Sequence, residues 1–201
     1  KKTMDISRAP FMAMGAVFVF LIMMFNIPIP DGSTAHAPGA ALIAIVLGPC
    51  AAVLVVSVAL LIQALIFGDG GILAFGANAF NMAFLMPFVS HYIYKAINRN
   101  AAPGSRRQFL AAGIAGYVAI NIAALAAAVE FGIQPILFHA PDGTPLYCPY
   151  GLSVSIPAMA MAHLTVAGFV EGIVTGLAVK YVAIQSHNRS LKETLLNGKE
   201  A

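Results

Sequence analysis

The length of its apolar stretches is the feature that most constrains what this chain can fold into. A helix that crosses the hydrocarbon core of a bilayer needs about 20 mostly apolar residues. Residues 9–28, 71–97, 109–131 and 153–184 each meet that length. Only 9% of the 201 residues are charged, whereas a soluble domain carries about 25%. So little charge cannot cover a water-facing surface, and we predict an all-α, polytopic helical bundle in a membrane.

A fifth apolar stretch, residues 37–67, is too long for one upright span and contains Gly48-Pro49 near its middle. Proline lacks an amide hydrogen and clashes with the preceding turn, so a helix breaks at such a site. We predict two short helices hinged there, which gives six helical segments in this fragment. All of them belong to a single transmembrane domain covering residues 1–201.

Lysine and arginine residues are distributed asymmetrically along the chain. They occur in residues 1–8, 95–107 and 180–199 and are absent from residues 29–38, 68–71 and 132–151. Because basic loops remain on the cytoplasmic side, the segments without them are expected outside and both termini inside. The hinged stretch then dips into the membrane and returns to the outer side. The net charge of +3 is too small and too scattered to indicate a nucleic-acid partner.

A stripe of small residues lies in the last apolar stretch. Gly168, Gly172 and Gly176 recur every four residues and therefore share one helix face. Small residues allow membrane helices to approach closely. The stripe is interpreted either as internal packing or as a docking face for another membrane subunit.

Polar residues within the apolar stretches are few, and they are the functional candidates because such groups are costly in lipid. His163 and Glu171 are eight residues apart, so a regular helix places them on about the same face. They form either a functional pair or a buried pair that fixes packing. His36 lies in an outer loop just before a short helix, where a histidine also serves as a cap or simply faces water.

Motifs of the common membrane enzymes and nucleotide-binding proteins are missing from the sequence. The chain contains no HExxH zinc motif, no GxxxxGK[ST] phosphate loop and no GxSxG nucleophile elbow. We therefore expect no catalysis in this chain. The energy for any transport has to come from elsewhere.

Two runs of sequence resemble one transporter family. The first is PDGSTAHAPGAAL at residues 30–42, followed by Leu47-Gly48-Pro49, and the second is IQALIFGDGGILAFGANAFNM at residues 62–82. The stretch from His163 to Glu171-Gly172 is similar as well. The family is the nickel/cobalt substrate-binding component of energy-coupling-factor ABC transporters, of the CbiM/NikM type. The resemblance covers most of the chain.

The resemblance implies a seven-helix, multi-pass protein of the prokaryotic inner membrane, with a nickel or cobalt ion as its transported substrate. Its implied partners are a transmembrane coupling subunit, cytoplasmic ATPase subunits and, in many cases, a small accessory membrane subunit. The internal metal-binding histidine of the family matches His36. Gln63, Asn78 and Asn81 are then groups that orient the ligands, since ligand-orienting hydrogen bonds are common at metal sites. Alternatively they are structural, because side-chain amides often join membrane helices by hydrogen bonds.

The remaining ligands in that family come from an N-terminal Met-His sequence, whose amine and imidazole enter the bundle. This chain starts Lys1-Lys2-Thr3 instead. We expect an upstream Met-His segment and one further helix. Neutral nitrogen ligands suit both ions, and planar nitrogen sites favour Ni²⁺. The runs Gly68-Asp69-Gly70-Gly71 and His36-Ala37-Pro38-Gly39 resemble the nickel members of the family more closely, so nickel is preferred and cobalt stays open.

Two other classes of protein remain as alternatives. One is a stand-alone, ion-coupled secondary transporter that uses His163 and Glu171 as its relay. The other is an intramembrane enzyme, against which the missing motifs argue.

Overall fold

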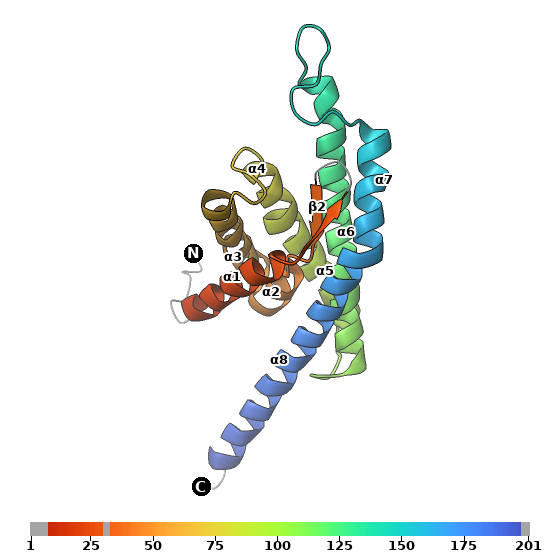
Figure 1. The fold of residues 1–201 in the computed structure, drawn as a ribbon. Helices are drawn as coiled ribbons and strands as arrows, with labels where there is room; N and C mark the ends of the chain where they lie inside the picture. The colour runs from red at the N-terminus through yellow and green to blue at the C-terminus, as the bar shows by residue number, and fades with distance from the viewer. Residues whose placement is uncertain (1–7, 30–32, 198–201) are drawn as a thin grey trace.

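The computed structural model of the chain describes residues 8–29 and 33–197, with only the backbone for residues 33 and 191–197. The described residues form six continuous helical segments, which confirms the predicted helical bundle (Figure 1). The segments are α1 (Ala9–Met23), α2 (Ala40–Leu47), α3 (Pro49–Ile62) with η2 (Gln63–Phe67), α4 (Phe75–Asn78) through η3 (Ala79–Leu85) to α5 (Met86–Asn98), α6 (Arg106–Leu137), and α7 (Leu152–Ala162) through η4 (His163–Ala167) to α8 (Gly168–Asn197).

Three of these helices are long and apolar enough to cross a membrane: Pro49–Phe67, Arg106–Leu137 and Leu152–Ser190. On α6, the side that faces the other helices is built from small side chains. On α6, Ala111, Ala115 and Ala119 have no exposed surface, whereas Leu110 and Ile114 on the opposite side are each 46% exposed. Small residues inside and large apolar residues outside are the arrangement that suits a helix between close neighbours and lipid.

The first predicted span was too long, because the helix ends at Met23 and not near Pro28. The chain continues as strand β1 (Asn26–Ile29), which pairs antiparallel with β2 (Ser33–His36). Pro28 cannot donate a helical hydrogen bond, and an unpaired backbone is costly within a membrane. The hairpin pairs this backbone without a helix and places Asn26 opposite His36.

The predicted hinge at Gly48-Pro49 is confirmed. Gly48 separates α2 from α3 with φ 93° and ψ 156°, a backbone conformation that is essentially restricted to glycine. Pro49 is the first residue of α3, where its missing amide hydrogen removes no helical hydrogen bond. The two helices therefore fold back on each other, and His36 before α2 and Asp69 after η2 line the same cavity.

Segments without basic residues gather at one end of the bundle, which we call the outer end. It consists of the β-hairpin, the loop after η2 and the loop between α6 and α7, the last of which stands at the top of Figure 1. At the opposite end Arg107 Nε donates to the Ile97 carbonyl (3.0 Å), and Gly104 packs against Ile184. The basic segment 95–107 and the start of the basic segment 180–199 thus share the second end.

The glycine stripe of α8 packs inside the chain. A Cβ atom on Gly172 would lie 2.9 Å from the Gly113 carbonyl of α6, and one on Gly176 would lie 2.9 Å from the Phe109 ring. Gly168 is covered in the same way by Tyr117 and Asn121. Because α6 already occupies this face, the docking interpretation does not hold for Gly168, Gly172 and Gly176.

Candidate metal-binding cavity

A cavity of about 600 Å³ lies at the outer end, between β2, η2, η3, α6 and η4. Its polar and ionisable lining side chains include His36, Gln63, Asp69, Asn78, Asn81, Glu130 and His163. The four residues predicted for a metal site, one histidine and three amides, are therefore brought together. Asp69, Glu130 and His163 are added to them by the fold.

His36 is the side chain whose environment most needs explaining. It ends β2, and both of its ring nitrogens are buried without a hydrogen-bond partner among the described residues. Burial lowers the pKa of His36 from 6.5 to about 4, and the nearby Asp69 carboxylate only partly opposes this. The imidazole is thus held neutral, which is the form that binds a metal ion. An unpartnered buried polar group costs free energy, and both nitrogens of this ring are in that state.

Gln63 and Asn81 also line the cavity and also have a buried polar atom without a hydrogen-bond partner among the described residues. Gln63 is 3% exposed and its Nε2 has no partner, and Asn81 is 4% exposed with an unpartnered Oδ1. Asn81 Nδ2 donates to Glu130 Oε2 at 2.7 Å. Asn78 instead holds the loop after η2, because its Nδ2 donates to the Gly70 carbonyl at 3.3 Å. Asn78 therefore shapes the cavity wall, whereas Gln63 and Asn81 offer free polar atoms to its contents.

The local backbone that presents these side chains is π-helical. Gln63 begins η2, Asn81 lies within η3, and His163 begins η4. A π-helical turn accommodates one extra residue and is frequent at functional sites. All three described π-helical turns thus carry a polar residue that lines the cavity, a feature that residue spacing in the sequence did not predict.

His163 and Glu171 are given different partners by the fold. His163 Nδ1 lies 2.8 Å from the Met159 carbonyl and must be the protonated nitrogen, because that oxygen can only accept. Glu171 has no exposed surface and accepts from the amides of Gly39 (2.9 Å) and Ala41 (3.4 Å) at the start of α2. The π-helical turn η4 lies between them and disturbs the regular spacing that would put them on one face.

Glu130 is a cavity residue that the sequence analysis did not identify. It is the only charged residue within the apolar stretch 109–131, and that isolation was the available signal, since carboxylates inside spans are costly. No group of three or more His, Cys, Asp or Glu side chains that could hold a metal ion occurs among the described residues.

A polytopic helical bundle with a polar chamber near one end of its spans is an architecture typical of membrane transport proteins. Within that class, the chain belongs to the CbiM family, described as the cobalt uptake substrate-specific transmembrane region, whose sequence profile matches residues 1–189. This is a family of nickel and cobalt transport proteins.

Relatives with close sequences carry nickel in their names. The chain is 57% identical over 173 residues to the fused nickel transport protein NikMN of Rhodobacter capsulatus. The matched region covers 86% of this chain and 50% of the relative. It is 53% identical to the probable fused nickel transport protein LarMN of Lactiplantibacillus plantarum, over 86% of this chain and 51% of the relative. The chain thus spans about half the length of these relatives.

A solved structure has the same fold. It is a crystal structure of a transition metal transporter, 54% identical, which superposes with a TM-score of 0.89 over 96% of this chain and 83% of that one.

Proposed function

We propose that this chain is the substrate-binding membrane component of an energy-coupling-factor importer, and that it captures Ni²⁺ or Co²⁺ in the cavity at its outer end. The observation that carries the proposal is His36, a neutral imidazole with both ring nitrogens buried and unpartnered. Nitrogen donors of this kind suit both ions. Membership of a nickel and cobalt transport family supplies the class of substrate.

Neighbouring side chains are assigned supporting roles. Gln63 and Asn81, with their unpartnered amide atoms, orient the bound ion's ligands. Asn78 fixes the loop after η2 through Gly70. The remaining ligands are proposed to be the amine and imidazole of an N-terminal Met-His sequence, as the resemblance to the family implies.

Nickel is the preferred ion. Two relatives that are more than half identical to this chain are named for nickel, whereas the family description names cobalt. Planar nitrogen sites also favour Ni²⁺.

Transport requires partners in this proposal. A transmembrane coupling subunit and cytoplasmic ATPase subunits supply the energy, in many cases with a small accessory membrane subunit, in the inner membrane of a prokaryote. This division agrees with a sequence that contains no phosphate loop of its own. The alternative of a stand-alone transporter with a His163–Glu171 relay has less support, because Glu171 already accepts from two amides of α2.

Calorimetric titration of the full-length protein with Ni²⁺ and Co²⁺ tests the proposal. His36→Ala should weaken Ni²⁺ binding by about 100-fold or more. Mutation of a group that only supports a metal ligand already lowers metal affinity by about 10–100-fold, and loss of the ligand itself should cost at least as much. His187→Ala is the matched control, because His187 is exposed on α8 and lines neither described cavity. Equal affinities of His36→Ala and the unmodified protein would rule out His36 as a ligand.

A further inference from the structure

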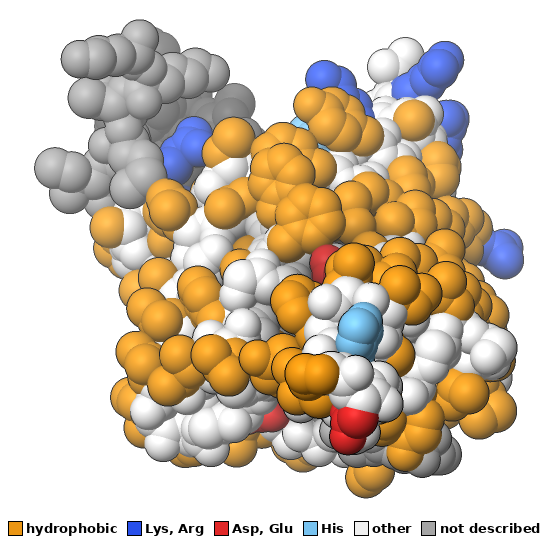
Figure 2. Space-filling view, turned by 90° about the horizontal axis from the view of Figure 1, so that it is seen from above, with side chains coloured by type: hydrophobic (Ala, Val, Ile, Leu, Met, Phe, Trp, Pro, Cys, Tyr) orange, Lys and Arg blue, Asp and Glu red, His pale blue; other side chains and the backbone are white. Residues whose placement is uncertain are grey.

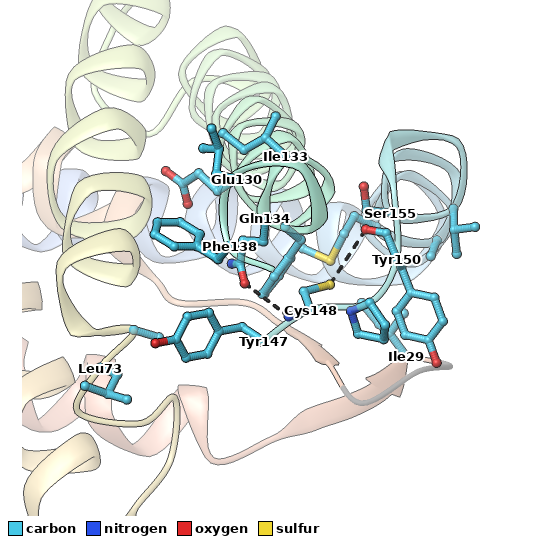
Figure 3. A pocket seen from close by; sticks show the side chains of 17 residues that line it. Ile29, Leu73, Glu130, Ile133, Gln134, Phe138, Tyr147, Cys148, Tyr150 and Ser155 are labelled. Atoms are coloured by element: carbon cyan, nitrogen blue, oxygen red, sulfur yellow. Dashed lines mark hydrogen bonds between the residues drawn. The ribbon is translucent and has the colours of Figure 1, made fainter. Parts of the chain in front are cut away.

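A second cavity, of about 780 Å³, lies beside the first at the outer end. Its walls come from the outer parts of α6 and α7 and from the loop between them, as Figure 3 shows. They are mostly apolar and aromatic, with Phe138, Tyr147 and Tyr150 among them. The loop is tied to α6 because the Cys148 amide donates to Gln134 Oε1 at 3.2 Å. This cavity is therefore bounded by a fixed loop near the outer surface.

The two cavities share part of their lining. Common to both are Leu73, Ala74, Glu130, Phe131, Gln134 and Met159. Glu130 and Gln134 are one helical turn apart on α6 and so share a face. Glu130 is the only ionisable side chain among the shared residues.

The Glu130 carboxylate lies where the two cavities meet, a place we call the junction, and it is held there by Asn81 of the first cavity. Asn81 donates to Glu130 Oε2 at 2.7 Å. Asn81 is itself almost fully buried, with an unpartnered Oδ1. The junction thus offers oxygen atoms that can accept, whereas the inner cavity also offers the unpartnered nitrogens of His36.

Charge at this end of the molecule favours a cation. The acidic residues Asp69, Glu130 and Asp142 lie in or beside the outer segments, and the sequence has no lysine or arginine between residues 109 and 151 or between residues 9 and 94. Figure 2, which looks onto this end, shows acidic side chains within the face and Lys and Arg toward its margins. Low-dielectric walls around charge of one sign focus the field and speed the association of counter-ions by about 10–1,000-fold.

We infer that the second cavity is the vestibule through which a divalent cation reaches the inner cavity, and that Glu130 is the carboxylate that passes the ion between them. The inference rests on the proposed function and adds the path of the ion to it. Oxygen ligands bind a transition-metal ion more weakly than imidazole nitrogen does. An ion therefore dwells briefly at Glu130 and is retained at His36, so that Glu130 governs the rates of exchange and not the final affinity.

Stopped-flow measurement of Ni²⁺ binding to the full-length protein in lipid nanodiscs, against a metallochromic indicator, tests this. Glu130→Gln keeps an oxygen that can accept from Asn81 and removes the charge. Its association rate constant should fall about tenfold, the lower limit of electrostatic focusing. Its dissociation rate constant should fall by the same factor, because the ion leaves by the same path, with Kd unchanged within about threefold. Asp142→Asn removes an outer charge that lines neither cavity and should alter the association rate less than twofold.

A second variant tests the path without touching charge. Val154→Trp fills the vestibule from α7, where Val154 lines only the second cavity and is 40% exposed. It should slow association and dissociation together at unchanged Kd.

The outcomes distinguish a failure of the proposed metal-binding function from a failure of the vestibule. If the unmodified protein does not bind Ni²⁺, the proposed function fails. If it binds Ni²⁺ but both variants keep normal rate constants, only the vestibule is overturned. A weaker Kd for Glu130→Gln at an unchanged association rate also overturns it, because Glu130 would then belong to the final site.

Discussion

Glu171 shows how this membrane protein accommodates an ionisable group with no exposed surface. Its carboxylate accepts from the backbone amides of Gly39 and Ala41, and Thr175 Oγ1 lies 3.5 Å from Oε1. These amides belong to the first turn of α2, which has no preceding helical partners for them. The carboxylate satisfies them and also complements the positive end of the α2 dipole. At the scale of single residues, Glu171 is therefore explained by the structure of α2.

We expect Glu171→Ala to reduce the free energy of unfolding by about 2–4 kcal/mol, because it leaves the buried amides of Gly39 and Ala41 unsatisfied. Thr175→Val should cost less than about 1 kcal/mol, since its single hydrogen bond is long. Denaturant unfolding of the purified protein in detergent measures both. Equal losses for the two variants would contradict the capping role of Glu171.

His36 and Glu130 differ in how visible they are in the sequence. His36 lies in a recognisable run of residues, and that run is enough to predict it as a ligand. Glu130 is surrounded by apolar residues and has no motif. Its role depends on Asn81, which is 49 residues away, and such a contact leaves no mark in local spacing.

At the scale of elements, the π-helical turns and the glycine stripe decide how the helices meet. The π-helical turn η2 ends the helix that begins with α3, whereas η3 and η4 lie within longer helices, and each turn directs one polar side chain into the cavity. The stripe of α8 lets that helix approach α6 so closely that Gly172 faces the Gly113 backbone. Close backbone contact between helices is a source of stability in membranes, where no hydrophobic force drives association.

Substitution at the closest point of this contact should be destabilising. Gly172→Ala places a Cβ atom 2.9 Å from the Gly113 carbonyl oxygen, and we expect a loss of about 1–3 kcal/mol from overpacking. Gly76→Ala is the matched control, because Gly76 is also helical and a Cβ atom there meets nothing within 4 Å. It should be neutral or stabilising by up to about 1 kcal/mol.

Thermal unfolding in detergent measures this pair of variants. Gly172→Ala should lower the unfolding temperature, and Gly76→Ala should leave it unchanged or raise it, because only Gly172 lies between two helices. A tolerated Gly172→Ala would mean that α6 and α8 are less tightly joined than the structure indicates.

At the scale of the whole molecule, charge and the hinge together define two ends. The loops of the outer end lack basic residues, and the opposite end contains the segments around Arg107 and Ile184. Gly48-Pro49 turns the hinged pair of helices so that His36 and Asp69 return to the same cavity. Cys50, just after the hinge, and Cys148, in the outer loop, are consequently predicted to lie on opposite sides of the membrane.

A membrane-impermeant maleimide should therefore label the two native cysteines from opposite sides. In intact cells we expect reaction with Cys148 in a Cys50→Ser variant and none with Cys50 in a Cys148→Ser variant. Both thiols are free, with Cys50 exposed and Cys148 partly exposed. Inverted membrane vesicles should reverse the result, and the opposite pattern would invert the orientation derived from the basic loops.

The sequence by itself determined the class of fold, the six helical segments, the hinge at Gly48-Pro49, and His36, Gln63 and Asn81 as candidates. These follow from local properties: the length of apolar stretches, the missing amide hydrogen of proline, the position of charge and a recognisable run of residues. Only the tertiary structure decided that the glycine stripe packs on α6, that His163 and Glu171 have separate partners, and that Glu130 joins two cavities. The physical reason is distance along the chain, since Glu171 bonds to Gly39, which is 132 residues away, and one π-helical turn is enough to change which face a residue presents.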